Sequence, residues 1–413
     1  MLPQLSEFDE IRPYEPSEMK QAFNDLLNDR QFSLMLKGFV PWLPKGVRNG
    51  LLKLAFIGVK TPLDFQLRFM KPIVWHIIRK HTDGCTFDDT KLVENLELII
   101  DNYDMSKGRT SADKGNHNSQ FSTLKSQFRY TFLSNHRDIV LDSAFLDVLL
   151  HKHHYPTTVE IGIGDNLLIY PWIKRLVRMN KAFTVRRGLT AHEMMRSSQL
   201  MSRYIHYAVT QKRENIWIAQ REGRAKDSDD RTQDSVLKML AMGGDLRELN
   251  IVPLTISYEY DPCDYLKAQE MQQKRDNPAF KKSRQDDLDN MQTGIFGYKG
   301  RVSYHCGTPV NTWVDQLDNS LPKNEYFTAL AYRMDREIHR GYQLYPCNYI
   351  AADLLEGKNS RTKHYTKADT ERFEKYLTGQ IAKITIPNKD VPYLRERILT
   401  MYANPLKNQQ AVL

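Results

Sequence analysis

Between residues 129 and 260 the chain alternates short apolar runs with longer segments of helical periodicity. Strand-like runs occupy residues 129–134, 159–164, 181–187, 216–220 and 251–259. Such alternation is typical of βαβ units, in which helices cover a sheet whose strands run largely in one direction. We therefore predict an α/β fold with a central mostly parallel or mixed β-sheet wrapped by helices, and with amphipathic helices at the N-terminus.

A histidine stands where the first of these runs gives way to a helix. His136 follows the run 129–134, and Asp138 and Asp142 come two and six residues later. An imidazole that titrates near neutral pH and a carboxylate that fixes its tautomer can together remove a proton from a hydroxyl group. The segment therefore predicts a general base, although a surface histidine beside a helix-capping aspartate has the same local sequence.

Further polar motifs follow His136 in a fixed order. Paired arginines close the run 181–187, Glu-Gly-Arg follows the run 216–220, and Val-Pro lies in the run 251–259. This succession of His/Asp, Phe-x-x-Arg, Glu-Gly and Val-Pro resembles the glycerolipid acyltransferases, which comprise the glycerol-3-phosphate and 1-acylglycerol-3-phosphate acyltransferases. The resemblance covers roughly residues 125 to 315 and implies that the protein is an acyltransferase.

The chain departs from this family at specific positions. The family places its aspartate five residues after the histidine, whereas Asp142 is six residues after His136. Lys181 stands where the second motif usually has glycine, and Arg221 replaces the usual proline of the third. We favour Asp142 as the partner of His136, because the apolar run after it resembles the family's, and Asp138 as the N-cap of the helix.

The resemblance also implies a mechanism and a set of substrates. His136 would act as base with Asp142 as its orienting partner, and the acceptor and its phosphate would be bound by Arg186, Arg187, Glu222, Gly223 and Arg224. The acyl group would pass directly from acyl-CoA or acyl carrier protein, with no further cofactor and no metal. The favoured acceptor is 1-acylglycerol-3-phosphate, in phospholipid biosynthesis. Glycerol-3-phosphate or another lyso-lipid or amino-lipid is an alternative, and so is an inactive membrane- or lipid-binding protein.

Positive charge is concentrated in the N-terminal part of the chain. The net charge is +9, and residues 30–80 contain ten basic residues but one acidic residue, Asp64. Apolar and aromatic residues are interleaved with these charges, and such basic amphipathic helices lie in the interface of anionic bilayers. We predict membrane lipids as partners and no nucleic acid, although helices packed on the catalytic core would also fit. The expected location is cytoplasmic, on the inner face of the membrane.

The sequence also suggests how the chain is divided. We expect N-terminal membrane-interface helices over residues 1–82, an α/β acyltransferase domain over 83–315 and a C-terminal helical extension over 316–413. The polar composition near residues 101–126 predicts a flexible insertion in the second of these. Four scattered cysteines favour a reducing compartment. The run His151-Lys152-His153-His154 is interpreted as a helix end rather than a metal site.

Overall fold

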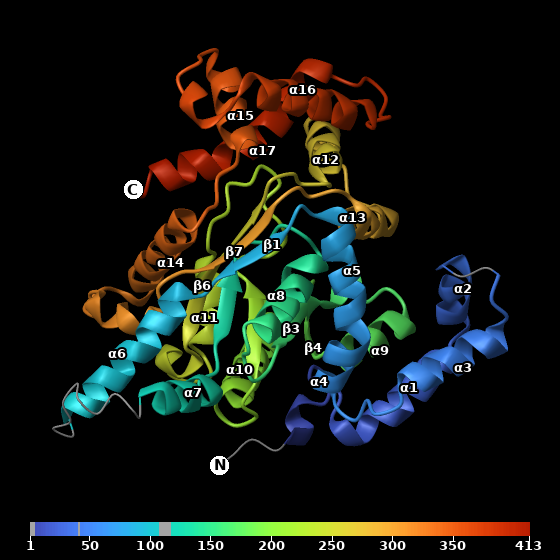
Figure 1. Ribbon diagram of the computed structural model, residues 1–413, viewed down its shortest axis with the longest axis vertical. Helices are drawn as coiled ribbons and strands as arrows, with labels where there is room; N and C mark the ends of the chain where they lie inside the picture. Colours follow the sequence, from blue (N-terminus) through green and yellow to red (C-terminus); the bar gives the residue numbers. More distant parts are fainter. Residues whose placement is uncertain (1–4, 40–41, 107–116) are drawn as a thin grey trace.

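The computed structural model describes residues 5–39, 42–106 and 117–413 (Figure 1). Within these ranges the strands form a seven-stranded sheet in the order β1-β7-β6-β2-β5-β3-β4. The strands are Cys85–Asp88 (β1), Thr131–Ser134 (β2), Val159–Gly164 (β3), Ala182–Val185 (β4), Asn215–Ala219 (β5), Ile251–Tyr258 (β6) and Val302–Cys306 (β7). All neighbouring strands in this sheet pair in parallel except β6 and β7, which are antiparallel. The predicted α/β fold with a mostly parallel or mixed sheet is confirmed.

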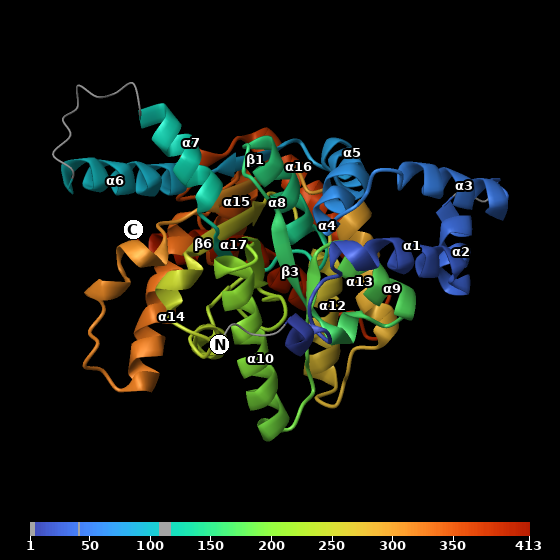
Figure 2. The same ribbon diagram turned by 90° about the horizontal axis from the view of Figure 1, so that it is seen from below.

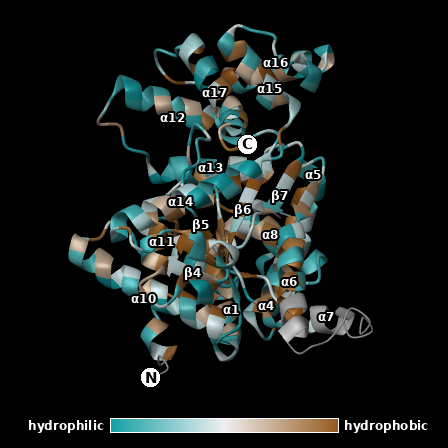
Figure 3. Ribbon diagram, turned by 90° about the vertical axis from the view of Figure 1, so that its left-hand side faces the viewer, coloured by the Kyte–Doolittle hydropathy of each residue, from teal (hydrophilic) through white to brown (hydrophobic). Residues whose placement is uncertain are grey.

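Helices cover both faces of the sheet (Figure 2). One face packs against α5 (Lys71–His81) and α8 (Leu141–Lys152), and its core includes Phe132. The other face packs against α10 (Ala191–Thr210), α11 (Asp234–Leu240) and α14 (Lys323–Arg340), and its core includes Leu133. Because successive side chains of a strand point to opposite faces, β2 contributes to both cores. Figure 3 shows the hydrophobic residues concentrated along the strands.

Helices α12 (Asp264–Asp276) and α13 (Arg284–Phe296) lie between β6 and β7 in the chain. The charged composition of this stretch would suit a loop or a solvated helix, and it forms two helices. Three further helices, α15 (Pro346–Glu356), α16 (Lys367–Ala382) and α17 (Val391–Gln410), have a hydrophobic core of their own. Together with α12 they form a group of helices beyond the C-terminal end of β6 (Figure 1). The expected C-terminal extension thus consists of α14, which packs on the sheet, and a separate helical lobe.

The N-terminal segment is helical as well. It contains α1 (Met19–Asn28), α2 (Arg30–Phe39), α3 (Lys45–Ala55), α4 (Pro62–Asp64) and the π-helical turn η3 (Phe65–Met70). Helix α1 packs on α9 (Pro171–Met179), whereas α2 and α3 lie far from the sheet in both views (Figures 1 and 2). In the described ranges no helix is long and apolar enough to cross a bilayer.

Two helices occupy most of the segment near 101–126 for which a flexible insertion was predicted. Helix α6 covers Thr90–Ser106 and α7 covers His117–Gln127, whereas residues 107–116 lie outside the described part of the chain. Leu92, Leu96 and Ile100 are buried at a helical spacing, and α6 continues beyond Ile100 into the segment predicted to be flexible. The polar helix α7 is held by Lys125, whose ammonium donates to the His153 carbonyl at 3.0 Å. Tertiary contact, rather than composition, makes these residues helical.

Short 3₁₀ turns complete the described chain: η1 (Leu5–Phe8), η2 (Pro16–Glu18), η5 (Asp165–Leu167), η6 (Leu246–Leu249), η7 (Val310–Thr312), η8 (Val314–Gln316) and η9 (Thr362–His364). Of the strands, β1 was not predicted. It has four residues, of which Phe87 is buried, and it pairs with β7, more than 200 residues away in the chain. Such a short strand has no periodicity of its own and is defined by its partner.

Candidate functional site

The predicted site residues follow the carboxyl ends of three parallel strands. His136 comes two residues after β2, Arg186 directly after β4, and Glu222 three residues after β5. Because the carboxyl ends of parallel strands meet at one edge of a sheet, the fold gathers these segments at the place where open α/β sheets bind their ligands. The tertiary structure therefore supports a single site at this edge.

The imidazole of His136 contacts the carboxylate of Asp142. The distance from Nδ1 of His136 to Oδ2 of Asp142 is 2.8 Å. Asp142 is fully buried and also accepts hydrogen bonds from the backbone N–H groups of Arg137, at 2.7 Å, and Asp138, at 3.0 Å. A carboxylate at Nδ1 favours the tautomer that carries its proton there and leaves Nε2 free to accept a proton. The arrangement is that of a general base with an orienting partner.

Asp138 has a different task. Its Oδ1 accepts hydrogen bonds from the N–H groups of Val140 and Leu141, both at 2.8 Å, at the start of α8. The N-cap position of α8 is Val140, so Asp138 lies two residues before the predicted capping position and closes the turn that leads into the helix. Burial and the charge of Asp142 raise the pKa of Asp138. The six-residue spacing is accommodated because His136 lies in the turn before α8 and Asp142 in its first turn.

Three aromatic residues surround this pair, and sequence reasoning did not single them out. The ring of Trp217 is 5.7 Å from that of His136, and its Nε1 donates to the Ser134 hydroxyl at 3.1 Å. The Tyr304 hydroxyl donates to the backbone carbonyl of Asp142 at 2.9 Å, and the Tyr258 hydroxyl lies 3.5 Å from its Oδ1. These residues come from β5, β7 and β6, so their proximity to Asp142 has no signal in the local sequence.

The paired arginines after β4 point to different partners. Arg187 donates to Oε1 of Glu222 at 2.7 Å, and its backbone N–H donates to Asp165 at 3.2 Å. Arg186 is exposed and forms an ion pair with Glu10. The structure thus brings Arg187 and Glu222 together at the strand ends, whereas Arg186 is directed toward the N-terminal segment.

The turn after β5 depends on a glycine. Gly223 has a φ of +69°, a conformation that residues with a side chain rarely adopt. Beyond the turn, Arg224 donates to Oδ1 of Asn290 on α13 at 3.0 Å. Its Nη1 is buried and has no hydrogen-bond partner among the described residues. Gly223 therefore allows the loop to turn from Glu222, which contacts Arg187, to Arg224, which contacts α13.

Arg137 links the turn that carries His136 to the same loop. It is buried, donates to the Ser228 hydroxyl at 2.6 Å and lies 3.6 Å from Asp230. The sequence gave no reason to choose this arginine over others, because its partners lie some 90 residues away. Its position holds the residues after His136 against the loop that carries Glu222.

The histidine run 151–154 lies at the end of α8. His153 is 3.4 Å from Asp89 and packs against Phe87. Over the ranges the structure describes, no group of three or more His, Cys, Asp or Glu side chains is arranged to hold a metal ion. These contacts are those of a helix end.

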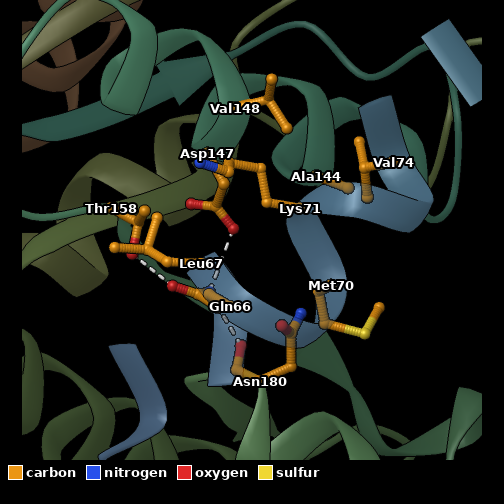
Figure 4. A pocket seen from close by; sticks show the side chains of 10 residues that line it. All are labelled: Gln66, Leu67, Met70, Lys71, Val74, Ala144, Asp147, Val148, Thr158 and Asn180. Atoms are coloured by element: carbon orange, nitrogen blue, oxygen red, sulfur yellow. Dashed lines mark hydrogen bonds between the residues drawn. The ribbon is translucent and has the colours of Figure 1, made fainter. Parts of the chain in front are cut away.

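A small cavity lies between α8 and η3, where Ala144, Asp147 and Val148 of α8 line it (Figure 4). Gln66 of η3 reaches into it and is buried. Its amide nitrogen donates to Asp147 at 3.0 Å and to the Asn180 carbonyl at 3.1 Å, and its oxygen accepts from the Thr158 hydroxyl. Gln66 therefore joins the N-terminal segment to α8, the helix that carries Asp142.

Comparison with known proteins gives the domain its family. Residues 118–257 match the acyltransferase family, so this part of the chain is an acyltransferase domain of the family that includes the glycerolipid acyltransferases. The match runs from α7 to β6 and contains each predicted site residue. No curated protein shows a significant match to the chain.

Proposed function

We propose that the protein transfers a fatty acyl group from a thioester donor to a hydroxyl of a glycerophosphate lipid in phospholipid biosynthesis, with 1-acylglycerol-3-phosphate as the acceptor. The family domain supports acyltransferase activity in general. The observation that carries the proposal is the 2.8 Å contact between His136 and a buried Asp142 at the carboxyl edge of the sheet.

In the proposed reaction, His136 Nε2 removes the proton from the acceptor hydroxyl. The oxygen then attacks the thioester carbonyl, and the tetrahedral intermediate collapses with loss of the thiol, which takes up the proton from His136. Asp142 stabilises the imidazolium that forms in between. Burial raises the pKa of Cys85 and Cys263 to about 12, so neither thiol is activated as a nucleophile. Direct transfer, without an acyl-enzyme, is consistent with this.

The acceptor phosphate is assigned to the arginines near the strand ends. Guanidinium groups bind phosphate oxygens with two parallel hydrogen bonds. Arg187 is held beside Glu222, and Arg224 has a buried nitrogen without a described partner. An incoming phosphate can take over Arg187, which leaves Glu222 free to accept a glycerol hydroxyl. Arg186 lies at the rim, where it would exchange Glu10 for the acceptor.

The N-terminal segment is proposed to place the enzyme on the inner face of the membrane. On α3, Val47, Leu51 and Leu54 are at least half exposed and follow one another at helical spacing. Trp42 and Ile57, on either side of the helix, are 76% and 70% exposed. An exposed apolar face flanked by lysines fits the interface of an anionic bilayer, from which an acyltransferase would take its lipid acceptor.

The test is release of free thiol from an acyl thioester by the purified protein with detergent-solubilised acceptors. We expect 1-acylglycerol-3-phosphate to be the best acceptor, and glycerol-3-phosphate is the first alternative to assay. His136→Ala should lower turnover by about 10²–10⁴-fold, the usual contribution of a general base. His192→Ala, on the exposed first turn of α10, is the matched control and should have wild-type turnover. A folded His136→Ala protein with near wild-type turnover would refute the mechanism, and a wild-type protein without activity would favour a lipid-binding role.

A further inference from the structure

An open groove lies in the N-terminal segment, between α1 and the end of α3. Its volume is about 420 Å³, which falls within the range of about 300–1,000 Å³ that small-molecule sites occupy. The rings of Phe23 on α1 and Phe56 at the end of α3 line it and stack with their centroids 3.7 Å apart. Met19 and Val59, which are buried, add to its apolar lining. We call this feature the α1–α3 groove, and its lining suits an apolar chain.

Three exposed lysines also line the α1–α3 groove. Lys20 belongs to α1, Lys53 to α3 and Lys60 to the turn after α3. Within the described part of the chain, none of their ammonium groups has a hydrogen-bond or ion-pair partner, and no carboxylate lines the groove. The five acids between residues 15 and 64 are engaged elsewhere: Glu15 with Lys212, Glu18 with Arg12, Asp25 with Gln21, Asp29 with Arg175, and Asp64 with the backbone N–H groups of Lys60 and Thr61. The groove therefore combines an apolar lining with uncompensated positive charge.

The α1–α3 groove lies toward the opposite edge of the sheet from His136. Just before α1, the N–H group of Tyr14 donates to the carbonyl of Arg178 at 3.2 Å, and Glu15 lies 3.5 Å from Lys212. Arg178 and Lys212 precede the amino ends of β4 and β5, whereas the predicted site follows the carboxyl ends of the strands. In Figure 1, α1 and α3 accordingly lie at the lower end of the molecule and α12 at the upper end. A ligand of the groove is therefore neither the acyl acceptor nor the acyl donor.

We propose that the α1–α3 groove binds one anionic phospholipid molecule of the bilayer. An acyl chain would lie along the apolar lining, and the three lysine ammonium groups would bind the headgroup phosphate. The bilayer is the source because the groove opens onto the exposed apolar face of α3: Ile57 lines the groove, is 70% exposed and follows Leu54 by three residues. A peptide fits less well, since its backbone N–H and C=O groups would lose their hydrogen bonds to water against this lining.

This inference rests on the membrane contact in the proposed function, and it is independent of the acyl-transfer reaction. Helix α1 packs on α9, which belongs to the acyltransferase domain, whereas α3 carries the face proposed to enter the bilayer. A lipid between the two helices would therefore connect the domain to the membrane. Stable attachment of a peripheral protein generally takes two signals, and a bound lipid would supply the second beside the apolar face.

The first experiment measures the binding of dioctanoyl phosphatidylserine, below its critical micelle concentration, by calorimetry. This lipid is neither acceptor nor product of the proposed reaction, and we expect one molecule to bind per chain. Dioctanoyl phosphatidylcholine, which has no net charge, should bind at least about tenfold more weakly. Lys20→Gln, Lys53→Gln and Lys60→Gln should each weaken binding of phosphatidylserine about fivefold. Lys37→Gln, an equal loss of charge at an exposed position of α2 outside the groove, should bind as wild type.

The second experiment separates the groove from the exposed face of α3. Asn24→Trp places a large ring at a lining position and should abolish binding of the monomeric phosphatidylserine. Gln21→Trp, at an exposed position of the same helix that does not line the groove, is the matched control and should bind as wild type. Leu51→Asp with Leu54→Asp should also keep this binding, because neither leucine lines the groove, although the double variant should lose affinity for vesicles.

Three results would each overturn the site: no binding or equal binding of the two lipids, wild-type binding by Asn24→Trp, and loss of the monomeric lipid in the double leucine variant. The last result would mean that the lipid only adsorbs to the apolar face of α3. A protein that binds the lipid through the groove but releases no thiol from a thioester would keep the site and refute the proposed reaction. An active enzyme that binds no phosphatidylserine would refute the site alone.

Discussion

At Asp142 the chain departs from the spacing of the glycerolipid acyltransferases that residues 118–257 resemble. Its buried carboxylate faces His136 Nδ1 and is held by two backbone N–H groups. These amides belong to Arg137 and Asp138, the two residues that follow His136. The extra residue in the turn is therefore accommodated by a local hydrogen-bonded loop that fixes the histidine and its partner together.

We expect Asp142→Asn to lower turnover by about 10²–10⁴-fold with little change in acceptor KM. An asparagine has the same shape but no charge to support the imidazolium, and its NH₂ group can turn toward Nδ1 and favour the wrong tautomer. Steady-state kinetics of the purified variant, with a thermal melt to show that it is folded, measures the effect.

Asp138→Asn is the matched comparison and should change turnover only a few-fold. Asparagine caps a helix about as well as aspartate, and a few tenths of a kcal/mol of helix-end electrostatics is at stake. Because the pKa of Asp138 is raised by burial and by Asp142, loss of its charge costs little. An inactive Asp138→Asn beside an active Asp142→Asn would mean that the functional pair is not the one in contact.

At the scale of elements, α3 combines two properties that a packed helix would not need. It is separated from the sheet, and its apolar residues Val47, Leu51 and Leu54 face solvent while its charges are basic. A contiguous apolar face of this kind is unusual on a soluble surface and marks an interaction site. The helix is therefore the element on which membrane binding is tested.

We expect the wild-type protein to bind anionic vesicles in a sedimentation assay, with an affinity that falls as salt rises, since exposed charges are screened over about 8–10 Å. The double substitution Leu51→Asp and Leu54→Asp should weaken binding more than tenfold, because a buried leucine contributes about 1.5–3 kcal/mol. Lys45→Gln with Lys53→Gln should weaken binding to anionic vesicles alone, by about 1 kcal/mol per lysine.

Tyr332→Asp is the control for these variants, because Tyr332 is 60% exposed on α14, outside the N-terminal segment. It should bind vesicles as the wild type does. Equal binding of the wild type to neutral and anionic vesicles, or binding to neither, would remove the interfacial role and favour helices that simply cover the core.

At the scale of the whole molecule, Gln66 connects the proposed membrane segment with α8, the helix that carries Asp142. Its side chain bonds Asp147 of α8, the Thr158 hydroxyl and the backbone around β3 and α9 (Figure 4). These partners lie between 81 and 114 residues away in the chain. The joint therefore fixes where the N-terminal segment sits on the acyltransferase domain.

We expect Gln66→Ala to lower the free energy of unfolding by about 2–4 kcal/mol, because it leaves several buried polar groups without a partner. It should also speed tryptic cleavage in the N-terminal segment, where Lys53 and Lys60 are exposed. Urea denaturation and limited proteolysis measure the two effects. Gln21→Ala, which removes an exposed hydrogen bond to Asp25, should change the free energy of unfolding by no more than about 0.5 kcal/mol. An equally small change for Gln66→Ala would show that the hydrogen bonds of Gln66 do not stabilise the contact between the N-terminal segment and α8.

The sequence by itself determined the elements whose signal is local. Alternating apolar runs gave the strands from β2 to β6 and the helices between them, because burial on both faces of a sheet leaves a continuous apolar signature. The order of the His/Asp, Phe-x-x-Arg, Glu-Gly and Val-Pro motifs carried the resemblance to the glycerolipid acyltransferases, and this resemblance implied the site residues His136, Asp142, Arg186, Arg187, Glu222, Gly223 and Arg224. The fold places these segments at one edge of the sheet, where the carboxyl ends of parallel strands meet.

The tertiary structure decided what depends on partners distant in the chain. Strand β1 forms because it pairs with β7, and α6 extends beyond Ile100 because its apolar side chains are buried. Tyr258 and Tyr304 lie against Asp142, and Arg186 pairs with Glu10 instead of lying beside Arg187 and Glu222. It also brought Lys226 of the loop after β5 and Lys282 of the loop before α13 next to Glu270 of α12. Hydrogen bonds and ion pairs act over a few ångströms in space, whatever the separation along the chain, and only the folded chain sets those distances.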